Sequence, residues 1–304
     1  MDSKESEKTG AREQQIVAAV NELPILPSVA ARVVTLANDP RSSAQEICEV
    51  IRSDPSLTAR ILRTVNSVYY GFQHRIDTVA QATVMIGTRD LVALVLGSTA
   101  LKTLEEAGRD VPHLDVFWLH SVSCAVAAKE VAAQFRYRVP GTAFVGGLLH
   151  DIGKLILIQH FPDEYAQVKE RVATSGTLLE QAEEDAFGAD HARVGAALAK
   201  RWSLPPALIE AVAFHHDPGR ASEEHALLVA MIHLADILAH RRPGRDADPR
   251  AAVLDEHAFA RLRQARLDFD ASYLDKLLAD LEGAMQKSAQ LLGALGVNVH
   301  DSDP

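Results

Sequence analysis

Apolar residues recur at helical spacing along almost the whole chain. In segment 55–66, for example, Leu57, Ile61 and Val65 fall on one face of a 3.6-residue helix. The same period predicts helices over 28–38, 55–66, 78–86, 88–104, 114–136, 142–158, 163–174, 177–187, 189–202, 205–216 and 222–240. Strand-like alternation of apolar and polar residues does not persist anywhere in the sequence. We therefore expect an all-α fold.

Capping and turn residues divide these helices into groups. Ser43 and Glu46 have the spacing of a capping box, and Asp54 followed by Pro55 is a typical helix start. Two stretches, 107–113 and 241–250, carry Pro and Gly and interrupt the helical pattern. We predict a disordered tail over 1–12, an N-terminal helical subdomain over 13–106, a core over 107–240, C-terminal helices over 241–296 and a tail over 297–304.

Composition narrows the class of protein further. The 304 residues are 47% apolar, 24% charged and only 5% aromatic, as expected for a globular helical protein. The net charge of −10 argues against a nucleic-acid partner. The N-terminus has no apolar signal region, and the longest apolar stretches, such as 91–101, are shorter than a membrane helix requires. Two well-separated cysteines imply no disulfide framework, so we expect a cytoplasmic protein that has no membrane partner.

Several histidines and aspartates lie on the apolar stripes of the predicted helices. The set consists of His120, His150, Asp151, His191, His215, His216 and Asp236. One histidine on an apolar face is usually a hydrogen-bonded core residue, whereas a buried carboxylate requires a cation or strong donors. Imidazole and carboxylate together are the ligands of a divalent transition metal. The pattern therefore predicts either a site for one or two metal ions or a hydrogen-bonded polar network in the core.

Lys154 follows Asp151 by three residues and can share its helix face. It can form a structural ion pair with Asp151 or bind an oxygen of a phosphate group. The spacing alone favours the ion pair.

The order of these residues resembles the H…HD…D pattern of the HD superfamily, whose enzymes are metal-dependent phosphohydrolases. The similarity is greater to one branch of it, the HDOD domain, and extends from about residue 23 to residue 236. The segments that carry it include Leu-Pro-Ile-Leu-Pro at 23–27, Asp-Pro-Ser-Leu-Thr at 54–58, Phe-Trp-Leu-His-Ser at 117–121, Gly-Leu-Leu-His-Asp-Ile-Gly-Lys at 147–154 and His-His at 215–216.

This resemblance implies an N-terminal helical bundle packed on an HD-like helical core. It also implies that all seven His and Asp residues are metal ligands, with Asp151 bridging a binuclear centre of Fe, Mn, Mg or Zn, and that Asp151 and Lys154 have catalytic roles. HDOD domains are similar to the HD-GYP phosphodiesterases that cleave cyclic di-GMP. Here Asp217-Pro218 replaces the hallmark that follows the His pair in that branch, and Val116 replaces a Glu that some of its members use.

The resemblance leaves two functions open. HDOD domains are generally regarded as signalling modules, which implies protein partners and no turnover. The complete ligand set implies instead a metal-dependent phosphohydrolase acting on a phosphomonoester, a nucleotide or a cyclic dinucleotide. A C-terminal apolar stripe is either a partner surface or packs on the core of the chain; it contains Leu274, Leu278, Leu281, Met285 and Leu292.

Three further polar residues lie close to this set in the sequence. Glu183 either orients a ligand or lies on a solvated helix face. His233 is expected to be an ordinary, partly exposed histidine, and the sequence assigns no role to His240.

Overall fold

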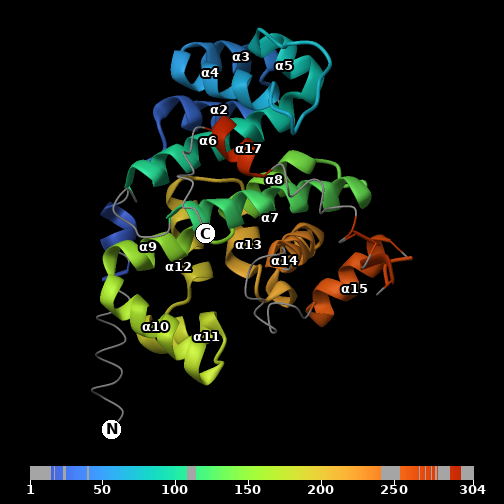
Figure 1. Ribbon diagram of the computed structural model, residues 1–304. Helices are drawn as coiled ribbons and strands as arrows, with labels where there is room; N and C mark the ends of the chain where they lie inside the picture. Colours follow the sequence, from blue (N-terminus) through green and yellow to red (C-terminus); the bar gives the residue numbers. More distant parts are fainter. Residues whose placement is uncertain are drawn as a thin grey trace.

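The structure is a computed structural model of the chain. It describes residues 15–16, 18–22, 25–39, 41–107, 114–240, 254–266, 268–270, 272–274, 276–277, 279 and 288–295. The regular elements within these ranges are all helices, and no strand occurs among them, which confirms the predicted all-α fold (Figure 1).

Four short helices form a layer at one end of the molecule (Figure 1). They are α2 (Ser28–Asn38), α3 (Ala44–Arg52), α4 (Pro55–Val65) and α5 (Val79–Ile86). The predicted caps are present, since Ser43 and Glu46 form a reciprocal capping box at the start of α3. At the start of α4, the Asp54 carboxylate accepts hydrogen bonds from two backbone N–H groups.

The helix α6 (Thr88–Ala107) connects this layer to the rest of the chain and packs against α8 (Pro140–Leu149). It begins directly after Gly87, whose φ of 83° lies in the left-handed region that favours glycine. Asp90 near the start of α6 accepts a hydrogen bond from the backbone N–H of Gly141 at 2.9 Å. A polar contact therefore supports the apolar packing between α6 and α8.

The second half of the molecule is built around α7 (Leu114–Gln134), α8 and α14 (Ala226–His240), which pack against one another. α9 (Ile152–His160) and α12 (His191–Arg201) form a second packed pair, and α12 also packs against α13 (Pro206–Phe214). The outer elements of this half are α10 (Pro162–Ser175), α11 (Leu179–Phe187), the 3-10 helix η1 (Pro218–Arg220) and α15 (Glu256–Ala265).

The single helix predicted over 142–158 is instead two helices. α8 ends at Leu149, α9 begins at Ile152, and His150 and Asp151 form the turn between them. The backbone of Asp151, with φ −97° and ψ 6°, has left the helical region. Periodicity could not show this break because the apolar spacing continues across it. Two other predicted helices are shorter than expected, since α13 ends before His215 and α14 begins at Ala226.

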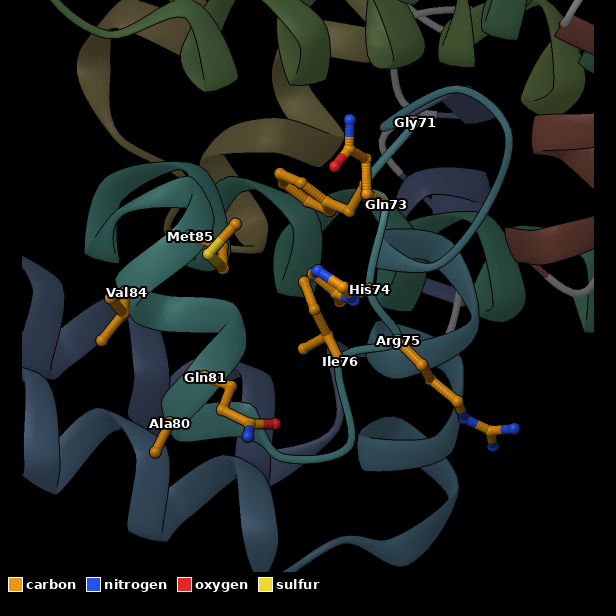
Figure 2. A pocket seen from close by; sticks show the side chains of 10 residues that line it. Gly71, Gln73, His74, Arg75, Ile76, Ala80, Gln81, Val84 and Met85 are labelled. Atoms are coloured by element: carbon orange, nitrogen blue, oxygen red, sulfur yellow. The ribbon is translucent and has the colours of Figure 1, made fainter.

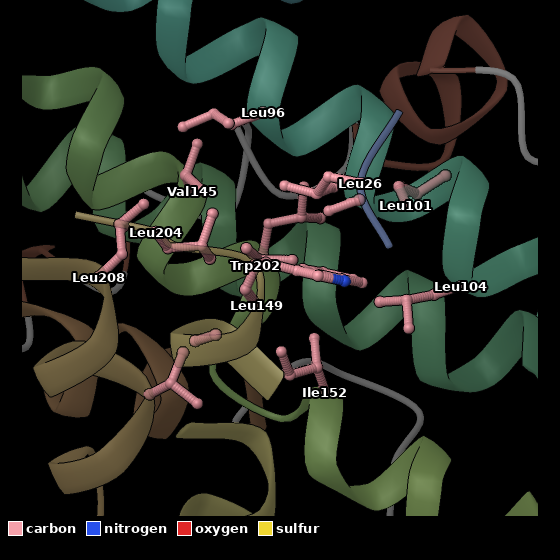
Figure 3. Close-up of a cluster of buried hydrophobic side chains, with 14 of the residues drawn as sticks. Leu26, Leu96, Leu101, Leu104, Val145, Leu149, Ile152, Trp202, Leu204 and Leu208 are labelled. Atoms are coloured by element: carbon pink, nitrogen blue, oxygen red, sulfur yellow. The ribbon is translucent and has the colours of Figure 1, made fainter. Parts of the chain in front are cut away.

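The buried apolar side chains form one large cluster that extends across both halves of the chain. Figure 3 shows part of it, where Trp202, Leu149 and Ile152 from the second half lie near Leu26 and Leu101 from the first. A second cluster lies between α7, α14 and α15. The two halves share this core, so the cluster itself does not mark a domain boundary. The boundary expected near residue 106 stays a prediction.

The C-terminal helix α17 (Ser288–Leu295) packs against α4 and α7. Leu292 of the predicted stripe is fully buried there, and Leu274 packs against the second cluster. Of the two alternatives for this stripe, these two residues therefore agree with packing on the core of the chain and not with a partner surface. Leu278, Leu281 and Met285 lie outside the described residues.

Two helical stretches, Leu114–Gln134 and Pro140–His160, are long and apolar enough to cross a membrane, and the bent pair α5–α6 would be a third if it formed one span. The expectation that no apolar stretch reaches this length was therefore wrong. In this fold, 67% and 83% of the apolar windows of the two stretches are buried inside the protein.

Candidate metal centre

The helices of the second half bring all seven predicted ligand residues into one cluster. His120 lies on α7, His150 and Asp151 form the turn after α8, and His191 is the first residue of α12. His215 and His216 follow the end of α13, and Asp236 lies within α14. Most of these residues occur where a helix begins or ends, which allows side chains from different directions to converge on one point.

Asp151 lies between two groups of histidines. Its Oδ1 faces His191 Nε2 at 3.2 Å and His215 Nε2 at 3.6 Å. Its Oδ2 faces His150 Nε2 at 3.4 Å and His120 Nε2 at 3.6 Å. One carboxylate thus presents one oxygen to each group, as a residue that bridges two metal ions must.

Asp236 completes the group around Oδ2 of Asp151. Its Oδ1 lies 3.1 Å from His120 Nε2 and 3.4 Å from His150 Nε2. Two ligand atoms bound at about 2.1 Å lie about 3.0 Å apart at right angles and about 3.4 Å apart at the tetrahedral angle. The observed spacing agrees with that of atoms around one shared ion, and it is also within the range of imidazole–carboxylate hydrogen bonds.

The group around Oδ1 of Asp151 is equally compact. His191 Nε2 lies 2.9 Å from His216 Nε2 and 3.4 Å from His215 Nε2. Three ring nitrogens this close, in a largely buried site, require a shared proton or a shared cation. A metal ion is the cation that bare imidazole nitrogens bind.

The backbone fixes which nitrogen of two histidines faces the centre. His150 Nδ1 donates to the carbonyl oxygen of Gly147 at 2.8 Å, and His215 Nδ1 donates to that of Val212 at 2.8 Å. A neutral imidazole that donates from Nδ1 carries its lone pair on Nε2. Nε2 is therefore the nitrogen that each residue directs towards Asp151, as in metal-binding histidines. It is unprotonated in His215, because burial lowers the pKa of that residue to about 4, whereas the Asp151 carboxylate outweighs burial and raises the pKa of His150.

Glu183 on α11 plays the corresponding part for His191. Its Oε2 accepts hydrogen bonds from Nδ1 of His191 at 2.5 Å and from the backbone N–H of His191 at 2.8 Å. Both side chains are fully buried. Of the two interpretations open at the sequence level, the geometry agrees with the one in which Glu183 orients a ligand.

Several buried polar atoms of the cluster have no hydrogen-bond partner. They include His120 Nε2, His150 Nε2, Asp151 Oδ1 and Asp236 Oδ1, all of which point into the cluster. Leaving such atoms unsatisfied costs about 1–3 kcal/mol each. Since each of them is a lone-pair donor of the type that binds transition metals, a pair of divalent ions fits the residues present.

Burial and neighbouring charges shift the pKa values within the cluster. Burial lowers the pKa of His120 and of His215 to about 4, so that both are neutral at pH 7. Burial opposes ionisation of Asp151, but His150 and Lys154 outweigh it and hold the pKa of Asp151 well below its usual value. Burial also disfavours charged His191, but the Glu183 carboxylate outweighs it and raises the pKa of His191 to about 9.

Two basic side chains lie where the cluster approaches solvent. Lys154 Nζ is 2.6 Å from Asp151 Oδ2, and its side chain is 16% exposed. His240, which the sequence did not single out, has Nδ1 3.0 Å from Asp236 Oδ1, and its side chain is 30% exposed. Its position one helical turn after Asp236 was the signal that could have identified it.

His233 supports the cluster from outside. Its Nδ1 donates to the carbonyl oxygen of His215 at 2.7 Å, and its Nε2 accepts from the backbone N–H of Asp255 at 3.1 Å. The partly exposed histidine expected from the sequence therefore links the His215 backbone to the segment before α15.

An all-helical core that gathers histidines and two aspartates in one buried cluster places the chain in the HD superfamily. The HDOD domain family matches residues 23–218, and the chain belongs to this family. The matched range includes every predicted ligand except Asp236.

The comparisons with known proteins agree with this assignment. An HDOD domain protein of unknown function from Geobacter sulfurreducens has 28% identity and a TM-score of 0.74, covering 93% of this chain and 99% of that one. A candidate phosphohydrolase from Shewanella amazonensis SB2B has 27% identity and a TM-score of 0.69, with coverages of 91% and 98%.

A curated relative, an uncharacterized protein of Treponema pallidum (strain Nichols), is 25% identical over 223 residues. These residues are 73% of this chain and 43% of the relative. The match therefore spans less than half of that protein's length.

Proposed function

We propose that this HDOD protein is a metal-dependent phosphohydrolase with a binuclear centre. The observation that carries the proposal is the position of Asp151, whose two oxygens face separate groups of ligand atoms. His120, His150 and Asp236 would hold one ion, and His191, His215 and His216 would hold the other. The name of the Shewanella neighbour supports the same class of reaction.

The chemistry that two such ions supply is the activation of water near neutral pH and the neutralisation of charge on a phosphoryl group. The residues of this chain prepare the site for it. The carbonyl oxygens of Gly147 and Val212 and the Glu183 carboxylate set the orientation of three imidazoles. Lys154, at the solvent side, places an ammonium group where it can pair with a phosphate oxygen.

The substrate class that this arrangement supports is a phosphoester whose phosphate enters beside Lys154 and His240. Nucleotides and cyclic dinucleotides belong to that class, as do phosphomonoesters. The chain lacks the Glu of trinuclear HD-GYP sites, having Val116 at that position, and 44% of Val116 is exposed. A centre of two ions is therefore the arrangement we propose.

Metal analysis combined with a turnover assay tests this proposal. Purified protein loaded with Mn²⁺ or Fe²⁺ should bind about two ions per chain and hydrolyse bis-nitrophenyl phosphate, a nucleotide or a cyclic dinucleotide. Asp151→Ala should lose both metal and turnover, whereas Asp163→Ala, which changes an exposed carboxylate on α10, should keep both. Wild-type protein that binds no metal would contradict the proposal.

A second candidate function is signalling through a protein partner without turnover. The observation that favours it is an open groove of about 740 Å³ between α5 and the segment from Gly71 to Ile76 (Figure 2). Val84 and Met85 line this groove and are 84% and 52% exposed, and neighbouring exposed apolar side chains in a groove are typical of an interaction surface. Among the described residues of the N-terminal half, no group of metal-ligating side chains occurs.

The two functions differ in a measurable way. Under the second, protein that holds two ions would hydrolyse none of the phosphoesters, and Val84→Asp would weaken a complex reconstituted from the chain and a purified partner. Gln73→Ala, on the same groove, is the matched polar control. Turnover by the wild type together with unchanged partner binding by Val84→Asp would exclude this alternative.

A further inference from the structure

A second cavity, of about 480 Å³, lies at the junction of the two halves of the molecule. Its walls come from α2, α3 and α6 on one side and from α8 and α13 on the other. Small-molecule sites have volumes of about 300–1,000 Å³ and occur preferentially between domains. The size and the place of this cavity are therefore those of a ligand site, and the cavity is separate from the metal centre.

Most of the lining is apolar. Leu96, Val145 and Leu208 form its buried part, and Figure 3 shows all three at the edge of the main core. Val92 and Ala207 continue the apolar surface towards solvent. An apolar ligand body would remove this surface from water.

Two charged residues line the cavity, and only one of them has an ion-pair partner among the described residues. The Asp39 carboxylate accepts three hydrogen bonds from Arg41, two of them from the guanidinium at 3.1 Å, so its charge is already matched. Arg89 lines the cavity at the start of α6, and the structure gives it no ion-pair partner among the described residues. In a chain of net charge −10, an unpaired guanidinium beside an apolar cavity is complementary to an anion.

We propose that this cavity binds a small amphipathic anion, with an apolar body between α6, α8 and α13 and a carboxylate or phosphate at Arg89. Ser42, Thr88 and Thr142 also line the cavity, and side chains of this type can form hydrogen bonds with the polar end of such a ligand. The inference does not depend on phosphohydrolase activity.

Calorimetric titration tests the proposal on the full chain, with sodium decanoate below its micellar concentration as the anionic probe and 1-decanol as the neutral one. Wild-type protein should bind decanoate with a stoichiometry of one. Arg89→Ala should weaken decanoate binding by at least about tenfold and leave decanol binding unchanged. Arg52→Ala, an exposed arginine on α3 outside the cavity, should bind both probes as the wild type does.

Filling the cavity provides an independent variant. Ala207→Phe places a larger side chain in it from a partly exposed position and should abolish binding of both probes while the melting temperature is retained. Absence of decanoate binding by the wild type would overturn the proposal, as would unchanged binding by both Arg89→Ala and Ala207→Phe. If binding is lost in Val84→Ser but kept in Ala207→Phe, the ligand lies in the open groove beside α5, and this result would also overturn the proposal.

Discussion

At the scale of single residues, the candidate centre depends on carboxylates that reach into a group of imidazoles. Asp151 and Asp236 are almost fully buried, and burial alone would favour their neutral forms. The surrounding histidines, together with Lys154 beside Asp151, hold the pKa of both carboxyls well below the usual value instead. Two buried negative charges are therefore available to compensate the charge of metal ions.

Replacing Asp151 by Asn keeps its shape and removes its charge. Because both groups of ligand atoms share this carboxylate, Asp151→Asn should reduce bound metal from about two ions per chain to less than one. Inductively coupled plasma analysis of dialysed protein provides the measurement. Asp163→Asn on the exposed surface is the control, and two ions in Asp151→Asn would show that Asp151 does not bridge.

Replacing Glu183 by Gln should affect only one of the two metal positions. The substitution removes the charge that orients His191, while Asp236 and His120 keep their contacts. Losing such a supporting carboxylate typically weakens metal binding by about 10- to 100-fold. Calorimetric titration with Mn²⁺ should show one weakened and one unchanged site, whereas the neighbouring Glu184→Gln should leave both unchanged.

The dependence of stability on pH follows from the shifted histidines of the metal-free protein. The pKa of His191 is raised to about 9, so its stabilising contribution is complete below about pH 6.5 and is lost as the pH rises through 9. The pKa values of His120 and His215 are lowered to about 4, so their contribution is lost as the pH falls from about 6.5 through 4.

The melting temperature in EDTA should therefore be highest near pH 6.5 and fall on both sides. Metal binding needs neutral His191, so the affinity for Mn²⁺ should rise between pH 6.5 and 9 and offset the alkaline loss. Scanning fluorimetry with EDTA and with Mn²⁺ measures both trends. A metal-free melting temperature that rises from pH 6.5 to 9 would show that Glu183 does not hold a proton on His191.

At the scale of helices, the site depends on where elements end and how closely they approach. The helix pattern on either side of His150 was predictable, because apolar spacing reports which face of a helix is buried. The break between α8 and α9 at His150 and Asp151 could not be predicted, because the residues on both sides of it are apolar. For Glu183 the sequence left two alternatives open, a ligand-orienting role and a solvated helix face. The hydrogen bond to His191 joins two helices across a turn, and sequence spacing does not show which side chains meet there.

Gly153 is a position where helix approach can be tested. A Cβ atom there would overlap the carbonyl oxygen of His191 and lie 2.7 Å from the backbone nitrogen of Gly195. Since the obstructing atoms belong to the backbone of α12, Gly153→Ala should separate α9 from α12 and destabilise the protein by about 1–3 kcal/mol.

Moving α12 also moves His191, so Gly153→Ala should weaken one metal position in addition to stability. Urea unfolding and Mn²⁺ titration measure the two effects. Gly293→Ala on α17 is the matched control, because a Cβ there meets nothing within 4 Å and alanine favours a helix over glycine. Equal stability of the two variants would show that the contact between α9 and α12 can adjust.

At the scale of the whole molecule, composition predicted the helical class but not the arrangement. Local hydropathy cannot distinguish a helix buried in a protein core from one buried in a membrane. For this reason α7 and the α8–α9 pair have the length and apolar character of membrane spans although most of each is buried inside the protein. His120 and His150 lie within or at the end of those same helices, where they meet Asp236 of α14. Their convergence is a property of the tertiary fold. Their places on apolar helix stripes suggested it beforehand without deciding between a metal site and a polar network, and the resemblance to HD proteins favoured the metal site.

The C-terminal helix α17 provides the last prediction, because it connects distant parts of the chain. Its Leu291, Leu292 and Leu295 are buried against the main cluster, and the carbonyl oxygen of Ala294 lies 3.4 Å from Thr64 Oγ1 on α4. If the two halves form one cooperative unit, truncating one of these leucines should destabilise the whole protein. Leu292→Ala should lower the free energy of unfolding by about 2–5 kcal/mol, the usual range for a buried leucine.

Urea unfolding followed separately by circular dichroism and by the fluorescence of Trp118 and Trp202 measures this effect. Both tryptophans lie in the second half, whereas circular dichroism reports on all helices. Coincident transitions, shifted together in Leu292→Ala and unshifted in the exposed control Gln290→Ala, are the expected result. Loss of helical signal at lower urea than loss of fluorescence would mean that α17 and the N-terminal helices unfold independently of the half that carries the metal centre.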